Sequence, residues 1–248
     1  MCSQIMYFDA ANGVSGDMFV GAMIDMGADF EKIKSDVMSL GIEGIELKAE
    51  KQSTHGITAT KFSVLEKATG RDIDSVRGGE HRHLSDIRDM LCKSSLDRNI
   101  ISSATFIFEI IAQAEADVHG ESIECVHFHE VGAIDSIVDI VAAASAFHQF
   151  DAEACASPIN TGSGTIECQH GILPVPAPAV LKMLRGIPVF SDGVQTELAT
   201  PTGVALLKYF CDSYGDIPKM KVYESGTGMG TRNIGRPNVF RVMLGEAV

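Results

Sequence analysis

The chain has 248 residues, of which 45% are hydrophobic and 21% charged, and its formal net charge at pH 7 is −13. A chain of this length can bury a core that folds without disulfides, and its acidic surface repels phosphate backbones, which excludes general nucleic-acid binding. No apolar run approaches the roughly 20 residues of a membrane-spanning helix, no signal peptide is recognisable and the six cysteines form no Cys-x-x-Cys pair, so we expect a soluble protein of the reducing cytoplasm.

The first 80 residues predict a strand–loop–helix unit, a second helix and a hairpin. The opening apolar run ends at Asp9, and a Gly-rich loop leads from it into a helix that Ser15 caps and Gly27 ends. The hairpin joins its two strand-like runs through residues 52–56, and the polar residues 67–80 predict a mobile loop. Strands are expected at 5–8, 45–50 and 57–65 and helices at 17–26 and 30–40.

The rest of the chain is rich in predicted helices up to residue 150 and in Pro, Gly and Thr after it. Alternating strands and helices predict an α/β fold, a layered mixed sheet flanked by helices, with a mixed α+β arrangement as the alternative. The shift in composition suggests a helix-rich half, 1–150, and a Gly/Pro-rich half, 151–248. Helices are expected at 84–91, 97–118, 131–147, 176–184 and 202–211, a short extended segment at 125–129 and a closing strand at 239–244.

The densest candidate site is a cluster of imidazoles and carboxylates around residue 130. If the segment before it is extended, Cys125, His127 and His129 share one face, and Asp135 and Asp139 are i,i+4 neighbours on the helix that follows. These donors suit zinc, nickel or copper better than magnesium or calcium. The predicted metal ligands are His127, His129, Glu130, Asp135 and Asp139. The alternative is that the two histidines are ordinary core or surface residues and that the two acids are solvated.

A second histidine pair, His81 and His83, lies just before the predicted helix at 84–91. On a mobile loop such a pair can collect a metal ion and pass it inward, so we include both histidines among the predicted metal ligands. The alternative is a solvated loop that happens to be rich in histidine, and neither histidine pair is specific for a metal by itself.

The Gly-rich loop near the N-terminus has the form of an anion-binding turn. A strand that ends in an acid is followed by a Gly-rich turn and a helix N-terminus, where backbone N–H groups hold anions. Asp9 and Asp17 would repel a phosphate unless a cation bridges them, so the pattern predicts a metal-bridged phosphate. Asp9, Ser15, Gly16 and Asp17 are therefore candidate cofactor-binding residues. The alternative is that Ser15 and Asp17 only cap the helix.

The second half of the chain contains three further segments with ligand-binding features. The glycines of 160–171 permit close backbone approach to a ligand, and Cys168 and His170 add two soft donors. Thr200 and Thr202, at the start of a predicted helix, either cap that helix or contact an anion, and we include both among the cofactor-binding residues. A third segment, residues 226–230, is predicted to form a Gly-rich loop.

Glu115 and His119 are i,i+4 neighbours on the long predicted helix at 97–118 and just beyond its end. An acid and a histidine at this spacing commonly interact on the surface of a helix. We therefore interpret them as an ordinary surface pair and assign them no chemical role.

Five segments together resemble one family, the LarC-type nickel insertion proteins of nickel-pincer cofactor biosynthesis. The segments occur in the family's order and extend over essentially the whole chain, which makes the resemblance far more specific than any single motif. They are residues 8–19, 126–140, 170–178, 197–203 and 226–230.

The resemblance implies a cytoplasmic nickel chelatase of the lyase class that delivers Ni(II) to pyridinium-3,5-bisthiocarboxylic acid mononucleotide. It implies dependence on CTP with a divalent cation, and a product, the nickel-pincer cofactor, that serves a client enzyme such as lactate racemase. Residues 1–248 would correspond to the family's N-terminal, metal-handling region. Family members continue beyond the position of Val248 into a C-terminal domain associated with the CTP site, so we expect a separate C-terminal partner chain or a missing domain. We also expect a homo-oligomer that binds neither nucleic acid nor membrane.

The nickel–carbon bond of that product forms with loss of a ring proton, so the reaction requires a general base. A histidine suits that role because its pKa lies near neutrality, and His127, His129 and His170 are the candidates. Two alternative functions remain. A nickel storage or chaperone protein would need only the metal-binding residues, and a metal-dependent phosphohydrolase would use the same acids and histidines around two metal ions.

Overall fold

The computed structural model describes residues 4–73, 82–128, 133–168 and 170–248. Its helices are α1 (Gly16–Met26), α2 (Phe30–Met38), α3 (Leu84–Lys93), α4 (Arg98–His119), α5 (Ile134–Phe147), α6 (Pro178–Met183) and α7 (Pro201–Phe210). Its strands are β1 (Gln4–Asp9), β2 (Ile45–Thr54), β3 (Ile57–Glu66), β4 (Arg82–His83), β5 (His127–Phe128), β6 (Glu153–Ala156), β7 (Ile159–Asn160), β8 (Thr165–Cys168), β9 (Gly171–Pro174), β10 (Val189–Phe190), β11 (Ser213–Tyr214), β12 (Met220–Met229) and β13 (Val239–Ala247). None of these helices is both long enough and apolar enough to cross a membrane.

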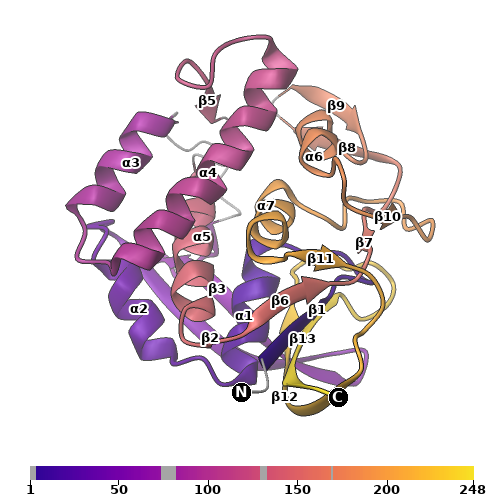
Figure 1. The fold of residues 1–248 in the computed structure, drawn as a ribbon. Helices are drawn as coiled ribbons and strands as arrows, with labels where there is room; N and C mark the ends of the chain where they lie inside the picture. The colour runs from indigo at the N-terminus through magenta and orange to yellow at the C-terminus, as the bar shows by residue number, and fades with distance from the viewer. Residues whose placement is uncertain (1–3, 74–81, 129–132, 169) are drawn as a thin grey trace.

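A seven-stranded sheet in the order β11-β6-β1-β13-β12-β3-β2 forms the base of the fold. β1 runs parallel to β6 and antiparallel to β13, so the sheet is mixed and takes strands from both sides of residue 150. α1 packs on β12, β3 and β13, α5 packs on α1, and α4 packs on α5, α6 and α7, which Figure 1 shows as successive layers of helices. The predicted α/β fold with a layered mixed sheet and flanking helices is confirmed.

Four buried phenylalanines join α1 and α7 to the centre of the sheet. The ring of Phe19 on α1 lies 4.9 Å from that of Phe8 on β1, 5.9 Å from that of Phe240 on β13 and 5.9 Å from that of Phe210 on α7, measured between ring centroids. Offset aromatic pairs at these separations add to the free energy gained from burying their area. The cluster therefore fixes the start of α1 and the end of α7 relative to β1.

Most elements predicted before residue 120 are confirmed, with ends displaced by a few residues. The predicted end of α1 at Gly27 is confirmed without displacement. The hairpin turn is tighter than predicted: β2 and β3 pair up to Thr54 and Ile57, so only His55 and Gly56, both with positive φ, form the turn. In the predicted loop 67–80, an isolated bridge joins Leu65 to Asp72, and residues 74–80 lie outside the described residues.

The prediction of a Gly-rich loop at 226–230 is wrong, because Gly226 and Gly228 lie within β12. A Cβ on Gly228 would collide with the carbonyl of Met18, and a Cβ on Gly226 with the carbonyl of Ala22. The glycines thus let α1 lie directly against the strand. Local propensity disfavours glycine in strands. Residues 226–229 nevertheless form a strand because the contact with a distant helix requires residues without a side chain.

Gly228→Ala is expected to lower the free energy of unfolding by about 1–3 kcal/mol, because the added methyl group forces α1 away from β12. Urea denaturation measures the change. Gly215→Ala is the matched control, since Gly215 has neither a positive φ nor an atom within 4 Å of an added Cβ. Equal unfolding free energies for the two variants would contradict the packing argument.

Candidate functional site

The loop after β1 places the N-termini of α1 and α7 side by side. The N–H of Val14 donates to the carbonyl of Leu198 at 2.9 Å, and the N–H of Thr200 donates to the carbonyl of Val14 at 3.0 Å. A Cβ on Gly13 or on Gly203 would collide with the opposing backbone, so glycine permits this approach. Two helix N-termini, each carrying the positive end of a helix dipole, therefore meet in one region that favours an anion.

The hydroxyl groups at these two N-termini are used differently. Ser15 occupies the predicted N-cap position of α1, but its side chain donates to the carboxylate of Asp17 and makes no capping bond. Thr200 caps α7, and its hydroxyl accepts from the N–H of Gly203 at 3.2 Å. Thr202 is buried in the first turn of α7. Of the two predicted threonines, Thr200 thus lies at the surface where the helices meet and Thr202 lies beneath it.

A buried lysine, Lys61 on β3, neutralises acids at the start of α1. Its ammonium forms an ion pair with Asp17 and donates to the hydroxyl of Thr231 at 2.7 Å, with only 8% of the residue exposed. Burial acts to lower the pKa of Lys61, but the charges of Asp17, Asp139 and Asp72 outweigh burial and raise that pKa above its usual value. Lys61 is therefore charged at neutral pH.

Gly16, the first residue of α1, lies against the carboxylate of Asp139 on α5, and a Cβ on Gly16 would collide with it. The predicted residues Gly16, Asp17 and Asp139 therefore come together from two helices that are distant in sequence. Asp135 lies one turn earlier on the same helix as Asp139. The i,i+4 relation predicted for the two aspartates is present in α5.

A pocket of about 140 Å³ opens where the two helix N-termini meet, and we call it the Arg232 pocket. The guanidinium of Arg232 donates to the backbone carbonyl of Glu197 at 2.7 Å and lies 3.6 Å from its carboxylate, which is buried. The polar residues that line it are Ser15, Asp17, Glu197, Thr200, Thr231, Arg232 and Asn238. The Arg232 pocket thus combines two helix N-termini, hydroxyl groups and a guanidinium that is half exposed.

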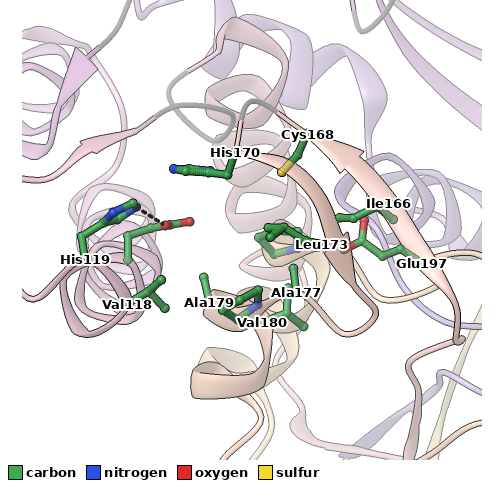
Figure 2. Close-up of a pocket in the computed structure, with 13 residues that line it drawn as sticks. Val118, His119, Ile166, Cys168, His170, Leu173, Ala177, Ala179, Val180 and Glu197 are labelled. Atoms are coloured by element: carbon green, nitrogen blue, oxygen red, sulfur yellow. Dashed lines mark ion pairs between the residues drawn. The ribbon is translucent and has the colours of Figure 1, made fainter.

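A second pocket, of about 200 Å³, lies between the end of α4 and the hairpin β8–β9, and we call it the histidine pocket (Figure 2). The imidazole rings of His119 on α4 and His170 on the hairpin face each other there, with centroids 5.1 Å apart. Cys168 and the apolar side chains of Ile166, Leu173 and Val180 also line it. Because Glu197 lines this pocket and the Arg232 pocket, the two are adjacent.

The Glu115–His119 pair is present, with 3.6 Å between its carboxylate oxygen and imidazole nitrogen. Both residues also line the histidine pocket beside His170, so the pair lies at the edge of a cavity as well as on the helix. Their side chains are only 21% and 27% exposed. The i,i+4 spacing predicts only that the two side chains are neighbours on one helix. It cannot predict the pocket, because the hairpin that completes it lies some fifty residues further along the chain.

The two predicted histidine segments also meet in the fold. β4 and β5 pair antiparallel, and the register places the backbone of His83 opposite that of His127. His81, His129 and Glu130 lie outside the residues that the structure describes. Within the described ranges no three His, Cys, Asp or Glu residues are close enough to hold one metal ion. The metal site predicted around residue 130 therefore stays a prediction.

Two other predicted features have structural roles away from the pockets. Asp9 ends β1 and accepts from the guanidinium of Arg241 on the neighbouring strand, at 3.0 Å from its Nε, and it lines neither pocket. Gly162 was expected to admit a ligand, but a Cβ there would collide with the carbonyl of Thr196. The close approach at Gly162 is therefore to the chain's own backbone at Thr196, next to Glu197 and Leu198, which line the pockets.

Comparison with known proteins shows which family the chain resembles. The model of a family described as nickel insertion protein matches residues 6–248. Three relatives carry the name pyridinium-3,5-bisthiocarboxylic acid mononucleotide nickel insertion protein. They come from Geobacillus kaustophilus (46% identity; 98% of this chain and 60% of the relative covered), Acetivibrio thermocellus (43%; 98% and 61%) and Desulfitobacterium hafniense DCB-2 (41%; 97% and 58%). The chain thus spans about 60% of the length of these relatives. No solved structure matches it.

Proposed function

The chain belongs to the nickel insertion protein family, and on that premise we propose that it binds Ni(II) and inserts it into pyridinium-3,5-bisthiocarboxylic acid mononucleotide. Ni(II) is a substrate of this chelatase reaction. The observation that carries the proposal is the pair of adjacent pockets that share Glu197, one with a guanidinium beside two helix N-termini and the other with two facing imidazoles.

The Arg232 pocket suits the phosphate of the mononucleotide. Phosphate groups bind where helix N-termini and a guanidinium converge, because backbone N–H groups and Arg donate charge-assisted hydrogen bonds. The carboxylates of Asp17 and Glu197 are each matched by one cation, Lys61 and Arg232. The positive ends of α1 and α7 then supply the net attraction for an anion.

The histidine pocket suits the pyridinium ring and its two sulfur-bearing groups. A flat ring packs between apolar side chains such as Ile166, Leu173 and Val180, and polar groups at the edge orient it. The imidazoles of His119 and His170 lie on the side opposite to Glu197 (Figure 2). A mononucleotide with its phosphate in the Arg232 pocket would therefore place its ring between Glu197 and the two imidazoles.

Glu197 is the group that we propose as the general base. When nickel bonds to the ring carbon, the C–H bond breaks, its electron pair forms the C–Ni(II) bond and the proton leaves, so no electron donor or acceptor is required. Glu197 is the carboxylate that lies at the boundary between the two pockets, where the ring would sit. A positioned carboxylate can accept such a proton. The histidines that the sequence suggests for this role, His127, His129 and His170, stay predictions.

The remaining features of the reaction are proposals that rest on the family alone. We propose that a C-terminal partner, outside residues 1–248, binds CTP with a divalent cation, and that the product serves a client nickel-pincer enzyme. The metal-handling role then belongs to residues 1–248, in the cytoplasm and in a homo-oligomer. His127, His129, Asp135 and Asp139 remain predicted ligands of a metal in that region.

An insertion assay tests the proposal. The chain is mixed with Ni(II), Mg²⁺, CTP and the mononucleotide, with and without the C-terminal portion of the Geobacillus relative, and product is detected by activation of apo lactate racemase. We expect product that depends on this chain and increases when the C-terminal portion is added. Bound nickel without product under both conditions would favour a storage protein, and phosphate release from generic phosphoesters would favour a phosphohydrolase. Either result overturns the proposal.

Arg232→Ala is expected to weaken mononucleotide binding about 10- to 150-fold, because a hydrogen bond to a charged group contributes roughly 1.5–3 kcal/mol. Isothermal titration with the metal-free mononucleotide measures the dissociation constant. Arg185→Ala is the control, since Arg185 is exposed and lines neither pocket. An unchanged dissociation constant in Arg232→Ala would remove the phosphate from this pocket.

A further inference from the structure

We propose that His119 and His170 form the site at which this chain holds Ni(II) before the ion is transferred. The identity of the metal rests on the proposed function, whereas the position rests on the geometry of the histidine pocket alone. The site differs from the metal site that the sequence predicts around residue 130. It uses one histidine to which the sequence patterns assign no role and another that they assign to proton transfer.

The separation of the two rings matches that of two imidazoles on one ion. A ligating nitrogen lies about 2.1 Å from the metal, so each ring centre lies roughly 3.2 Å from it. Two such rings at ligand–metal–ligand angles between about 90° and 109° have centres roughly 4.5–5.2 Å apart. The centroids of His119 and His170 are 5.1 Å apart. The centroid separation of the two rings therefore lies within the range that one bound ion allows.

Glu115 gives His119 the support that metal-binding histidines commonly have. A ligating imidazole usually directs its second nitrogen at a carboxylate, which fixes the ring and makes the ligating nitrogen more basic. The Glu115 carboxylate lies 3.6 Å from Nε2 of His119 and is placed to act in this way. Both residues lie in the last turn of α4, where the negative end of the helix dipole also favours a cation.

The small number of protein donors suits an ion that must leave. A closed four-ligand site holds a metal permanently, whereas an open site keeps positions for other ligands. Two imidazoles leave positions for the two sulfur atoms of the mononucleotide, with the Cys168 thiol in the same pocket. Imidazole also selects nickel, copper or zinc over magnesium and calcium.

Nickel titration of the metal-free, untagged chain by calorimetry tests the assignment. His119→Ala and His170→Ala are each expected to weaken nickel binding at least about 100-fold, since loss of an outer-shell partner alone costs 10- to 100-fold. Glu115→Gln is expected to weaken it about 10-fold for that reason. The control is His55→Asn, an exposed histidine in a turn where φ is positive and asparagine is tolerated. Circular dichroism confirms that each variant is folded.

A dissociation constant within about threefold of wild type in both alanine variants would overturn the assignment. So would a loss of binding in His83→Ala/His127→Ala with none in the His119 and His170 variants, because that result places nickel near β4 and β5. These outcomes are independent of the insertion assay. Nickel bound at His119 and His170 without product would contradict the proposed function only, whereas product with unaltered nickel affinity in the variants would contradict this site only.

Discussion

Lys61→Met is expected to lower the free energy of unfolding by about 3–5 kcal/mol, because it removes one partner of a buried ion pair and leaves the other charge uncompensated. The side chains of Lys61 and Asp17 are 9% and 16% exposed, so water reaching Asp17 through the Arg232 pocket replaces the lost ammonium only in part. Asp139 also lies close enough for its charge to act on Lys61. Methionine preserves most of the volume of the lysine side chain, so the loss of unfolding free energy comes from the missing charge and not from altered packing.

Lys51→Met is the matched control for this prediction. Lys51 also pairs with an aspartate, Asp25, whose side chain is 13% exposed, but the side chain of Lys51 is 61% exposed. Water can therefore take the place of its ammonium, and the expected loss is about 0–1 kcal/mol. Adding Asp17→Asn to Lys61→Met should recover part of the loss, because it removes the stranded charge. Equal losses in Lys61→Met and Lys51→Met, measured by urea denaturation at pH 7, would contradict the claim that Lys61 compensates buried acids.

The contribution of Lys61 to the free energy of unfolding should fall at high pH and should not change at lower pH. Its pKa is raised in the folded state, so the folded protein keeps this proton where the unfolded chain has lost it. The stabilisation is therefore complete below the usual lysine pKa of 10.5 and is lost as pH rises through the higher folded value. The difference between wild type and Lys61→Met is expected to stay constant from about pH 6 to 9 and to shrink above that usual value.

The parts of the fold that could be predicted are those with local signals. The strand at Asp9, the Gly-rich loop and α1 follow from an apolar run, a cap residue and Gly27, all within some twenty residues. β6 to β11 were not predicted because each has only two to four residues and its pairing partner often lies far along the chain. β12 was missed for a different reason: glycine is unfavourable in strands unless a distant helix needs the space.

The same division applies to the candidate site. Ser15, Asp17 and Thr200 could be recognised because each lies at a helix N-terminus that the sequence marks with hydroxyl groups, acids and proline. Lys61 and Arg232 could not, because a cation on β3 or in the loop after β12 has no local pattern that distinguishes it from a solvated charge. Only the fold brings these residues to the start of α1 and to Glu197.

The histidine pocket shows most clearly why spacing alone was insufficient. His-x-His pairs are recognisable in the sequence because their members are close neighbours in it. The rings that face each other in the histidine pocket, His119 and His170, are 51 positions apart. Each is ordinary in its own context, one ending a helix and the other near the turn of a hairpin. The two rings meet because α4 ends beside the β8–β9 hairpin, and the packing of α4 on α6 contributes to that arrangement.

Glu197→Gln is expected to slow nickel insertion by about 10²- to 10⁴-fold, the usual contribution of a general base. The amide keeps the shape of the buried side chain and leaves the hydrogen bond from Arg232 to the backbone carbonyl of residue 197 in place, but it cannot take the ring proton. Because the imidazoles lie on the opposite side of the pocket, nickel affinity should stay within about threefold of wild type. Single-turnover insertion, with the C-terminal portion and CTP supplied, measures the rate.

Glu167→Gln is the matched control, since Glu167 lies on β8 but is exposed and lines neither pocket. Glu197→Asp keeps the charge and shortens the reach, so it should retain more activity than Glu197→Gln. A loss of nickel or mononucleotide affinity that accounts for the whole rate effect would make Glu197 a binding residue. An undiminished rate in Glu197→Gln would return the role of base to a histidine, and the proton would then leave on the same side of the ring as the metal arrives.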